Sequence, residues 1–144
     1  MGKVLYTARA QVEGGRIDGR ARTSDGQLDV RIRPPKEVGG DGEGTNPEQL
    51  FAAGFAACFE NALWLVGRRK KVETGDAKVE SRVHLMAGED RNFVLGVEMD
   101  VTLPSISDAG EAKDLVGMAH KVCPYSNATR GNIDVAFTVN GEPL

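Results

Sequence analysis

The chain has 144 residues, of which 40% are hydrophobic, and a net charge of −3 at pH 7. This length can bury one hydrophobic core, so we expect a single domain over residues 1–144. The mildly acidic balance argues against a nucleic-acid partner, and two cysteines are too few for a disulfide scaffold. The opening MGKVLYTARA lacks the apolar core of a signal peptide, which predicts a cytoplasmic location.

Alternating apolar and polar residues at the start of the chain predict an antiparallel meander. Its three strand segments are KVLYTARAQV (3–12), RIDGRART (16–23) and LDVRIR (28–33). Gly-Gly and Ser-Asp-Gly sequences between them suit tight turns. The Gly-rich stretch 34–44 predicts a loop, and it lacks the Lys-Ser/Thr ending of a phosphate-binding loop.

Residues 47–70 predict a long helix. Asn46 can cap it, Pro47 suits its first position, and Gln49 can reach back to the cap. The first half is apolar on both faces, while two polar residues near the centre argue against a membrane span. Such a helix should be central, covered on all sides by sheet or by a second subunit. Because a chain this small has little material for that cover, we expect an intertwined homodimer.

The second half of the chain predicts strands and one further helix. The helix spans about 108–122, with Asp108 as cap and Glu111 in the capping-box position. One helix face carries Ala112, Leu115, Val116, Ala119 and Val122. Alternating segments predict strands at 77–88, 93–103 and 132–139. The order of elements predicts an α+β fold, in which antiparallel sheets pack around the long helix.

Cys58 lies inside the apolar helix, where two interpretations compete. Free cysteines usually behave as small buried hydrophobes. A reactive thiol must instead be a thiolate, which burial disfavours, so a cation would have to offset the burial. A guanidinium is suitable because it stays protonated when desolvated. The candidate cations are Arg16, Arg20 and Arg22.

Glu48 and Cys123 are the other residues of interest for a thiol site. Glu48 lies ten residues before Cys58, about 15 Å along an unbroken helix. Direct contact within one straight helix is therefore excluded, and a favourable charge at the helix N-terminus is the simpler role for Glu48. Cys123 lies just before Pro124, at the predicted end of the second helix. By position the two thiols fit an attacking and resolving pair, but two unrelated structural cysteines fit as well.

Two long motifs carry a family resemblance. TNPEQLFAAGFAACFENAL (45–63) and AHKVCPYSNATRGNIDV (119–135) closely resemble the organic hydroperoxide resistance proteins, the Ohr branch of the Ohr/OsmC family of thiol peroxidases. The similarity extends from VLYTA near the start to the last strand. It implies an OsmC-like intertwined homodimer and an enzyme that reduces organic hydroperoxides during oxidative stress.

The resemblance also implies roles for individual residues. Cys58 matches the peroxidatic cysteine and Cys123 the resolving cysteine, which together form a disulfide during the cycle. Glu48 matches the glutamate that orients an active-site arginine. Arg16 matches that arginine, although GGRIDGR is one residue longer before SDG than the family pattern, which keeps Arg20 as the alternative.

The family's substrates and reductants complete the prediction. Alkyl or fatty-acid hydroperoxides suit the apolar candidates Phe51, Phe55 and Phe59, each of which could equally pack in the core. The resemblance implies recycling by dihydrolipoyl groups on lipoylated proteins, with no metal, flavin or haem cofactor. Two alternatives use the same fold: a thiol-disulfide oxidoreductase, and a binding protein without activity.

Overall fold

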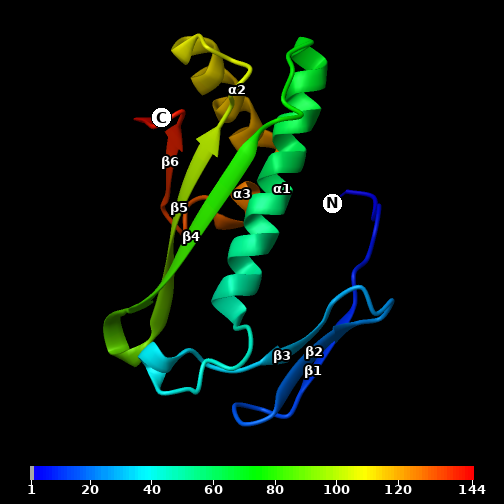
Figure 1. The fold of residues 1–144 in the computed structure, drawn as a ribbon, viewed down its shortest axis with the longest axis vertical. Helices are drawn as coiled ribbons and strands as arrows, with labels where there is room; N and C mark the ends of the chain where they lie inside the picture. Colours follow the sequence, from blue (N-terminus) through cyan, green and yellow to red (C-terminus); the bar gives the residue numbers. More distant parts are fainter. Residues whose placement is uncertain (1) are drawn as a thin grey trace. The chain divides into compact units, whose positions relative to one another are not determined.

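The computed structural model describes residues 2–144, which form two compact units (Figure 1). One unit is Met1–Leu50 and the other is Phe51–Leu144, so the division falls within the long helix α1 (Pro47–Lys70). The N-terminal unit contains the first sheet. The second unit contains the rest of α1, the second sheet and the remaining helices, and it holds both cysteines.

The first sheet is the predicted meander. Strands β1 (Ala10–Glu13), β2 (Gly19–Thr23) and β3 (Asp29–Ile32) pair antiparallel in the order β1-β2-β3. The strand predicted from residue 3 begins only at Ala10, however. Residues 3–9 have no strand partner within the part of the chain that the structure describes, and a strand cannot form without one. Their apolar side chains stay highly exposed: Val4, Leu5 and Tyr6.

The turn between β1 and β2 is longer than the predicted Gly-Gly turn. Gly14 and Gly15 both have positive φ, and the Asp18 N–H donates to the Gly14 carbonyl at 3.2 Å. A side chain at position 14 would collide with the Asp18 carbonyl, so this turn requires glycine. As a result β2 begins at Gly19, and Arg16 lies in the turn rather than in the predicted strand.

Helix α1 begins and ends where the sequence predicts. The Asn46 side chain caps it by accepting from the Gln49 N–H at 2.9 Å, but the Gln49 side chain accepts from Thr45 Oγ1 instead of reaching back. Trp64 and Leu65 are 52% and 38% exposed, so one chain does not cover the helix on all sides. The buried side consists of Phe55, Phe59, Ala62, Leu63, Val66 and Gly67.

Length and apolar character alone would allow α1 to cross a membrane, and it is the one helix within residues 2–144 that meets this criterion. The central helix of a water-soluble protein meets it too. In this chain the buried side of α1 packs into the core of the second unit. That packing accounts for the apolar residues on the buried side of the helix.

The second sheet is mixed rather than purely antiparallel. Strands β4 (Lys78–Ala87) and β5 (Phe93–Thr102) form the predicted antiparallel pair, but β6 (Val135–Val139) lies parallel to β5. A parallel neighbour requires a long crossover, and the two helices between β5 and β6 provide it. A short strand, β7 (Glu142–Pro143), completes the order β4-β5-β6-β7.

Helix α2 (Ala109–Val122) follows β5 and has the predicted cap, with Asp108 accepting from the Glu111 N–H at 2.7 Å. Val122, predicted on the buried face, is 36% exposed because it lies in the last turn. The residues after Cys123 form a further short helix, α3 (Pro124–Thr129), which the sequence did not predict. The core between these helices, α1 and the sheet includes Leu63, Val97, Met99, Leu115, Val116 and Ala119.

Candidate functional site

The fold brings the two cysteines together. Cys58 lies on α1 and Cys123 at the junction of α2 and α3, 65 positions later, yet their sulfur atoms are 3.5 Å apart. Cys123 is fully buried, whereas Cys58 is half-buried at the edge of the core. Two thiols in van der Waals contact need only a small displacement to reach bonding distance.

The position of Cys123 follows from the local sequence. Its backbone is extended (φ −64°, ψ 121°), so Cys123 is both the C-cap of α2 and the N-cap of α3. Its N–H still donates to the Ala119 carbonyl, while its own carbonyl accepts from the Asn127 N–H. Pro124 stops α2 and suits the first position of α3. The thiol is therefore fixed at a sharp junction between two helices.

Electrostatics within the second unit disfavour a thiolate at Cys58. Burial raises the pKa of the Cys58 thiol, and the backbone N–H of Tyr125 lowers it by hydrogen bonding to the sulfur. Cys123 also raises the pKa of Cys58, first through the hydrogen bond between the two sulfur groups and then because two thiolates in contact would repel each other. The N-terminus of α1 is too far along the helix to help. A positive charge from elsewhere would be needed for reactivity.

The two candidate arginines differ in their own partners, both within the N-terminal unit. Arg20 forms a bidentate pair with Asp29, with N–O distances of 2.7 and 2.6 Å, and this pairing raises the pKa of Arg20. Arg16 donates to the Val38 carbonyl at 3.3 Å. Its guanidinium therefore keeps more unused donors than that of Arg20. Glu48 is half-buried in the first turn of α1, and α1 runs unbroken past Gly54 to Cys58 and beyond.

The three candidate phenylalanines have different surroundings. Phe51 and Phe55 pack edge-to-face with ring centroids 6.0 Å apart, and both contact the Tyr125 ring, at 6.2 and 5.7 Å. Phe59 is fully buried against Phe137, with centroids 5.0 Å apart. Phe51 is only partly buried and lies beside Tyr125 at the edge of the core, whereas Phe55 and Phe59 are both fully buried within it.

Comparison with known proteins supplies the family. Residues 40–138 match the family described as OsmC-like protein. The chain belongs to the OsmC-like family. An organic hydroperoxide resistance protein of Xanthomonas axonopodis pv. citri is 49% identical over 140 residues, covering 95% of this chain and 96% of its own. Organic hydroperoxide resistance protein OhrB of Bacillus subtilis is 46% identical, covering 91% and 95% of the two chains.

Solved structures of OsmC-like proteins agree with this assignment. An organic hydroperoxide resistance protein from Elizabethkingia anophelis, with crystallant-derived thiocyanate bound, has a TM-score of 0.92 and 44% identity. The match covers 98% of this chain and 100% of the Elizabethkingia anophelis chain. A putative organic hydroperoxide resistance protein from Vibrio cholerae, with captopril in one of its active sites, has the same TM-score and identity and covers 99% of this chain. The resemblance drawn from the two motifs is confirmed, as is the α+β fold.

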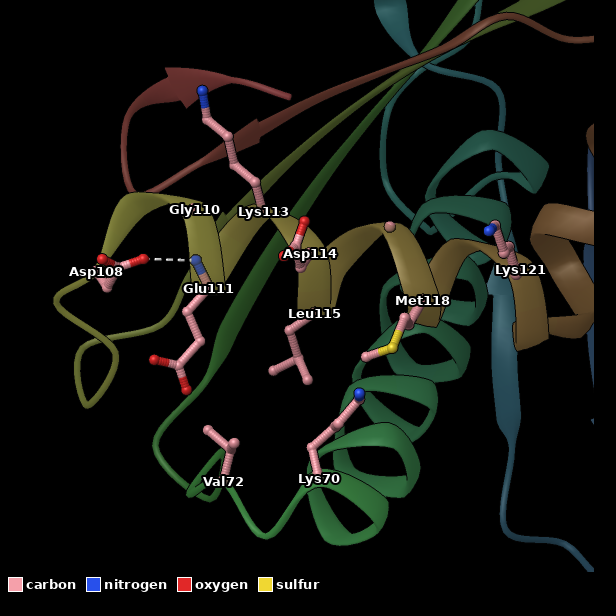
Figure 2. Close-up of a pocket in the computed structure, with 11 residues that line it drawn as sticks. Lys70, Val72, Asp108, Gly110, Glu111, Lys113, Asp114, Leu115, Met118 and Lys121 are labelled. Atoms are coloured by element: carbon pink, nitrogen blue, oxygen red, sulfur yellow. Dashed lines mark hydrogen bonds between the residues drawn. The ribbon is translucent and has the colours of Figure 1, made fainter.

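A surface pocket on this OsmC-like chain lies along α2, from its cap Asp108 to Lys121, and beside the end of α1 (Figure 2). Its lining carries charges of both signs, such as Lys70 and Glu111, over apolar side chains such as Leu115 and Met118. It contains neither cysteine. The thiol pair, rather than this pocket, is therefore the candidate active site.

Sequence reasoning missed the polar anchor behind Cys123. His120 Nδ1 and the fully buried Ser126 Oγ are 2.8 Å apart, and Arg130 donates to the His120 carbonyl at 2.6 Å. Burial, and secondly the nearby Arg130 charge, lower the pKa of His120. The sequence did not predict this contact, because the spacing of His120 and Ser126 across a proline fits neither one face of a helix nor one face of a strand. Only the junction between α2 and α3 brings the two side chains together.

Proposed function

We propose that this OsmC-like chain is a cysteine-based peroxidase that reduces organic hydroperoxides to alcohols. The observation that carries the proposal is the 3.5 Å contact between the Cys58 and Cys123 sulfur atoms. Its relatives' name, organic hydroperoxide resistance protein, supports the substrate class. A contact between two otherwise free thiols in such a family is most simply explained as a redox couple.

The reaction proceeds in two chemical steps at the thiol pair. The Cys58 thiolate attacks one peroxide oxygen, the O–O bond breaks, and the alkoxide leaves and takes up a proton as the alcohol. Cys58 is then a sulfenic acid. The Cys123 thiol attacks that sulfur, water leaves with the sulfenic oxygen, and a Cys58–Cys123 disulfide forms. Partial burial of Cys58 protects the sulfenic acid from further oxidation.

In this proposal Arg16, oriented by Glu48, supplies the positive charge that a thiolate at Cys58 requires. Arg16 stabilises the Cys58 thiolate and donates to the peroxide oxygens as negative charge develops on the leaving oxygen. Glu48 orients the guanidinium through a bidentate pair. Arg20 is the alternative, but its two hydrogen bonds to Asp29 would first have to be released. This difference favours Arg16.

A dithiol restores the enzyme by thiol-disulfide exchange. Its two thiols reduce the Cys58–Cys123 disulfide and become a disulfide themselves, so electrons and protons balance. We propose a dihydrolipoyl group on a lipoylated protein in the cytoplasm as this reductant, with no bound cofactor in the cycle. The partly buried Phe51 and the partly exposed Tyr125, with the fully buried Phe55 behind them, provide an apolar surface that suits alkyl or fatty-acid peroxides better than hydrogen peroxide.

We also propose that the active form is an intertwined homodimer. Three apolar surfaces of the single chain support it. The segment 3–9 has no strand partner and exposes Val4, Leu5 and Tyr6. Helix α1 exposes Trp64, and β5 exposes its first residue, Phe93. Exposed apolar area of this extent on a small chain usually marks an interface.

A peroxidase assay tests the proposed chemistry. Reduced protein is mixed with cumene hydroperoxide and a lipoamide and lipoamide dehydrogenase system, and NADH consumption is followed. We expect steady turnover by the wild type and none above background by Cys58→Ser. For Cys123→Ser we expect one equivalent of alcohol followed by a stalled cycle, with a sulfenic acid on Cys58 that a dimedone-type reagent traps.

Further measurements on the wild-type protein separate the two alternative functions. A thiol-disulfide oxidoreductase would reduce insulin disulfides faster than it reduces cumene hydroperoxide. A binding protein without activity would consume no NADH with any organic hydroperoxide. Wild-type protein without turnover would refute the proposal, and full activity of Cys58→Ser would refute the choice of nucleophile.

A further inference from the structure

Tyr125 links the two cysteines in a way that the proposed mechanism does not use. It lies two residues after Cys123, in the first turn of α3, and its ring packs against Phe51 and Phe55 on α1, shortly before Cys58. The residue is 39% exposed, so filling the core does not explain its position. Its ring instead bridges the helix of one thiol and the junction that holds the other.

Gly54 provides the space for this ring. A Cβ at position 54 would lie 3.0 Å from the Tyr125 hydroxyl oxygen, 3.3 Å from Cε2 and 3.4 Å from Cζ. These distances are shorter than ordinary carbon contacts. Glycine is also among the least favourable residues within a helix. The presence of Gly54 in the middle of α1 is explained by the tyrosine ring that lies against it.

The backbone on the other side of the ring is held firmly. The Thr129 hydroxyl donates to the Tyr125 carbonyl at 3.0 Å, and Ser126 is anchored to His120 at 2.8 Å. Cys123 shares this anchored junction, since its carbonyl accepts from the Asn127 N–H. A displacement of the Tyr125 ring from α1 would therefore move Cys123 with it.

We propose that Tyr125 is a positioning residue: its ring, seated over Gly54, holds the α2–α3 junction against α1 and keeps the Cys123 sulfur within reach of the Cys58 sulfur. The proposal rests on the role of the cysteine pair in the proposed function. The backbone N–H of Tyr125 supports it, because the same seating brings this donor to the Cys58 sulfur.

The test measures the equilibrium constant for forming the Cys58–Cys123 disulfide, called the closing constant below, in the absence of peroxide. Protein is equilibrated with mixtures of reduced and oxidised dithiothreitol, and the dithiol and Cys58–Cys123 disulfide forms are quantified by alkylation and mass spectrometry. Tyr125→Ala should lower the closing constant by about tenfold or more, because an ångström of misplacement can cost an intramolecular reaction two orders of magnitude. Tyr125→Phe keeps the ring and should stay close to wild type.

Gly54→Ala provides a second, independent variant, and Gly117→Ala its matched control. Both place an alanine within a helix, but an added Cβ at position 117 meets no atom within 4 Å. Gly54→Ala should lower the closing constant, and Gly117→Ala should leave it unchanged. In Tyr125→Ala protein the Gly54→Ala effect should disappear, because the ring it displaces is gone.

An unchanged closing constant in folded Tyr125→Ala would overturn the proposal, and so would equal effects of Gly54→Ala and Gly117→Ala. Should Tyr125→Ala fail to fold, the two glycine variants decide alone. The peroxidase assay tests the proposed function separately. Wild-type protein that closes the disulfide but turns over no hydroperoxide would refute the peroxidase and leave the role of Tyr125 intact, whereas wild-type protein that never forms the Cys58–Cys123 disulfide would refute both.

Discussion

Cys58 illustrates how one side chain can have opposite requirements. Burial raises the pKa of its thiol and by itself would leave it inert, yet in the proposed mechanism the same apolar surroundings would favour an organic hydroperoxide and protect a sulfenic acid. Only a charge that remains when desolvated can reconcile the two. Of the two arginines that the family resemblance leaves as candidates, Arg20 is held by Asp29 in a bidentate pair and Arg16 is not.

We predict that Arg16→Ala raises the thiol pKa of Cys58, because burial then acts without an opposing cation. The measurement is the pH dependence of iodoacetamide alkylation in a Cys123→Ser background, where one thiol remains. Alkylation of the Arg16→Ala variant should reach half its maximum above the pKa of an unperturbed thiol, about 8.5. The parent with Arg16 should reach it below that value.

Arg20→Ala is the matched control for this prediction. It removes a neighbouring arginine of the same unit, and with it the pair to Asp29, but should leave the alkylation midpoint unchanged. A larger upward shift for Arg20→Ala than for Arg16→Ala would show that the longer GGRIDGR segment places Arg20 at the thiol instead.

At the scale of single elements, helix termini were the most predictable features. Asp108 caps α2 through one hydrogen bond to the Glu111 N–H, visible in Figure 2. We predict that Asp108→Ala lowers the free energy of unfolding by about 1 kcal/mol, the typical value of an N-cap. Urea denaturation under reducing conditions, at one fixed protein concentration, measures the loss.

Asp108→Asn separates the hydrogen bond from the charge in this prediction. Asparagine caps about as well as aspartate, so the variant should keep most of the stability that alanine loses. An equal loss in both variants would mean that the negative charge at the start of α2, rather than the capping bond, stabilises the helix.

The elements that the sequence predicted correctly are those determined by local chemistry. The limits of α1, both N-caps and the β4–β5 pair depend on residues that are close in sequence. The errors concern partners that no local pattern specifies. The sequence could not reveal that β6 lies parallel to β5, that residues 3–9 have no partner strand in one chain, or that α3 begins at Pro124 itself.

The same distinction applies to the candidate site. Both cysteines could be singled out from their motifs, but their 3.5 Å contact depends on how α2 packs against α1. Tyr125 could not be recognised, because its significance comes from a missing side chain at Gly54, on another helix. A residue whose role depends on packing against another element can be recognised only once the structure shows where that element lies.

At the scale of the whole molecule, the inner face of the second sheet extends beyond the helices of its own chain. Residues alternate between the two faces of a strand, so Phe93 shares its face with the buried Val97, and Val94 faces the other way. Phe93 is nevertheless 75% exposed. An apolar face that continues the core but has no cover in one chain is what a second copy of an intertwined dimer would bury.

We therefore predict that Phe93→Glu converts the proposed homodimer into a monomer, because a carboxylate would have to be buried without a partner. Val94→Glu is the matched control: it places the same charge one residue further along β5, on the opposite face, and should leave the dimer intact. Sedimentation velocity over a range of protein concentrations distinguishes the two states. A wild-type monomer at all concentrations would refute the dimer, and dissociation by Val94→Glu but not by Phe93→Glu would place the interface on the other face of the sheet.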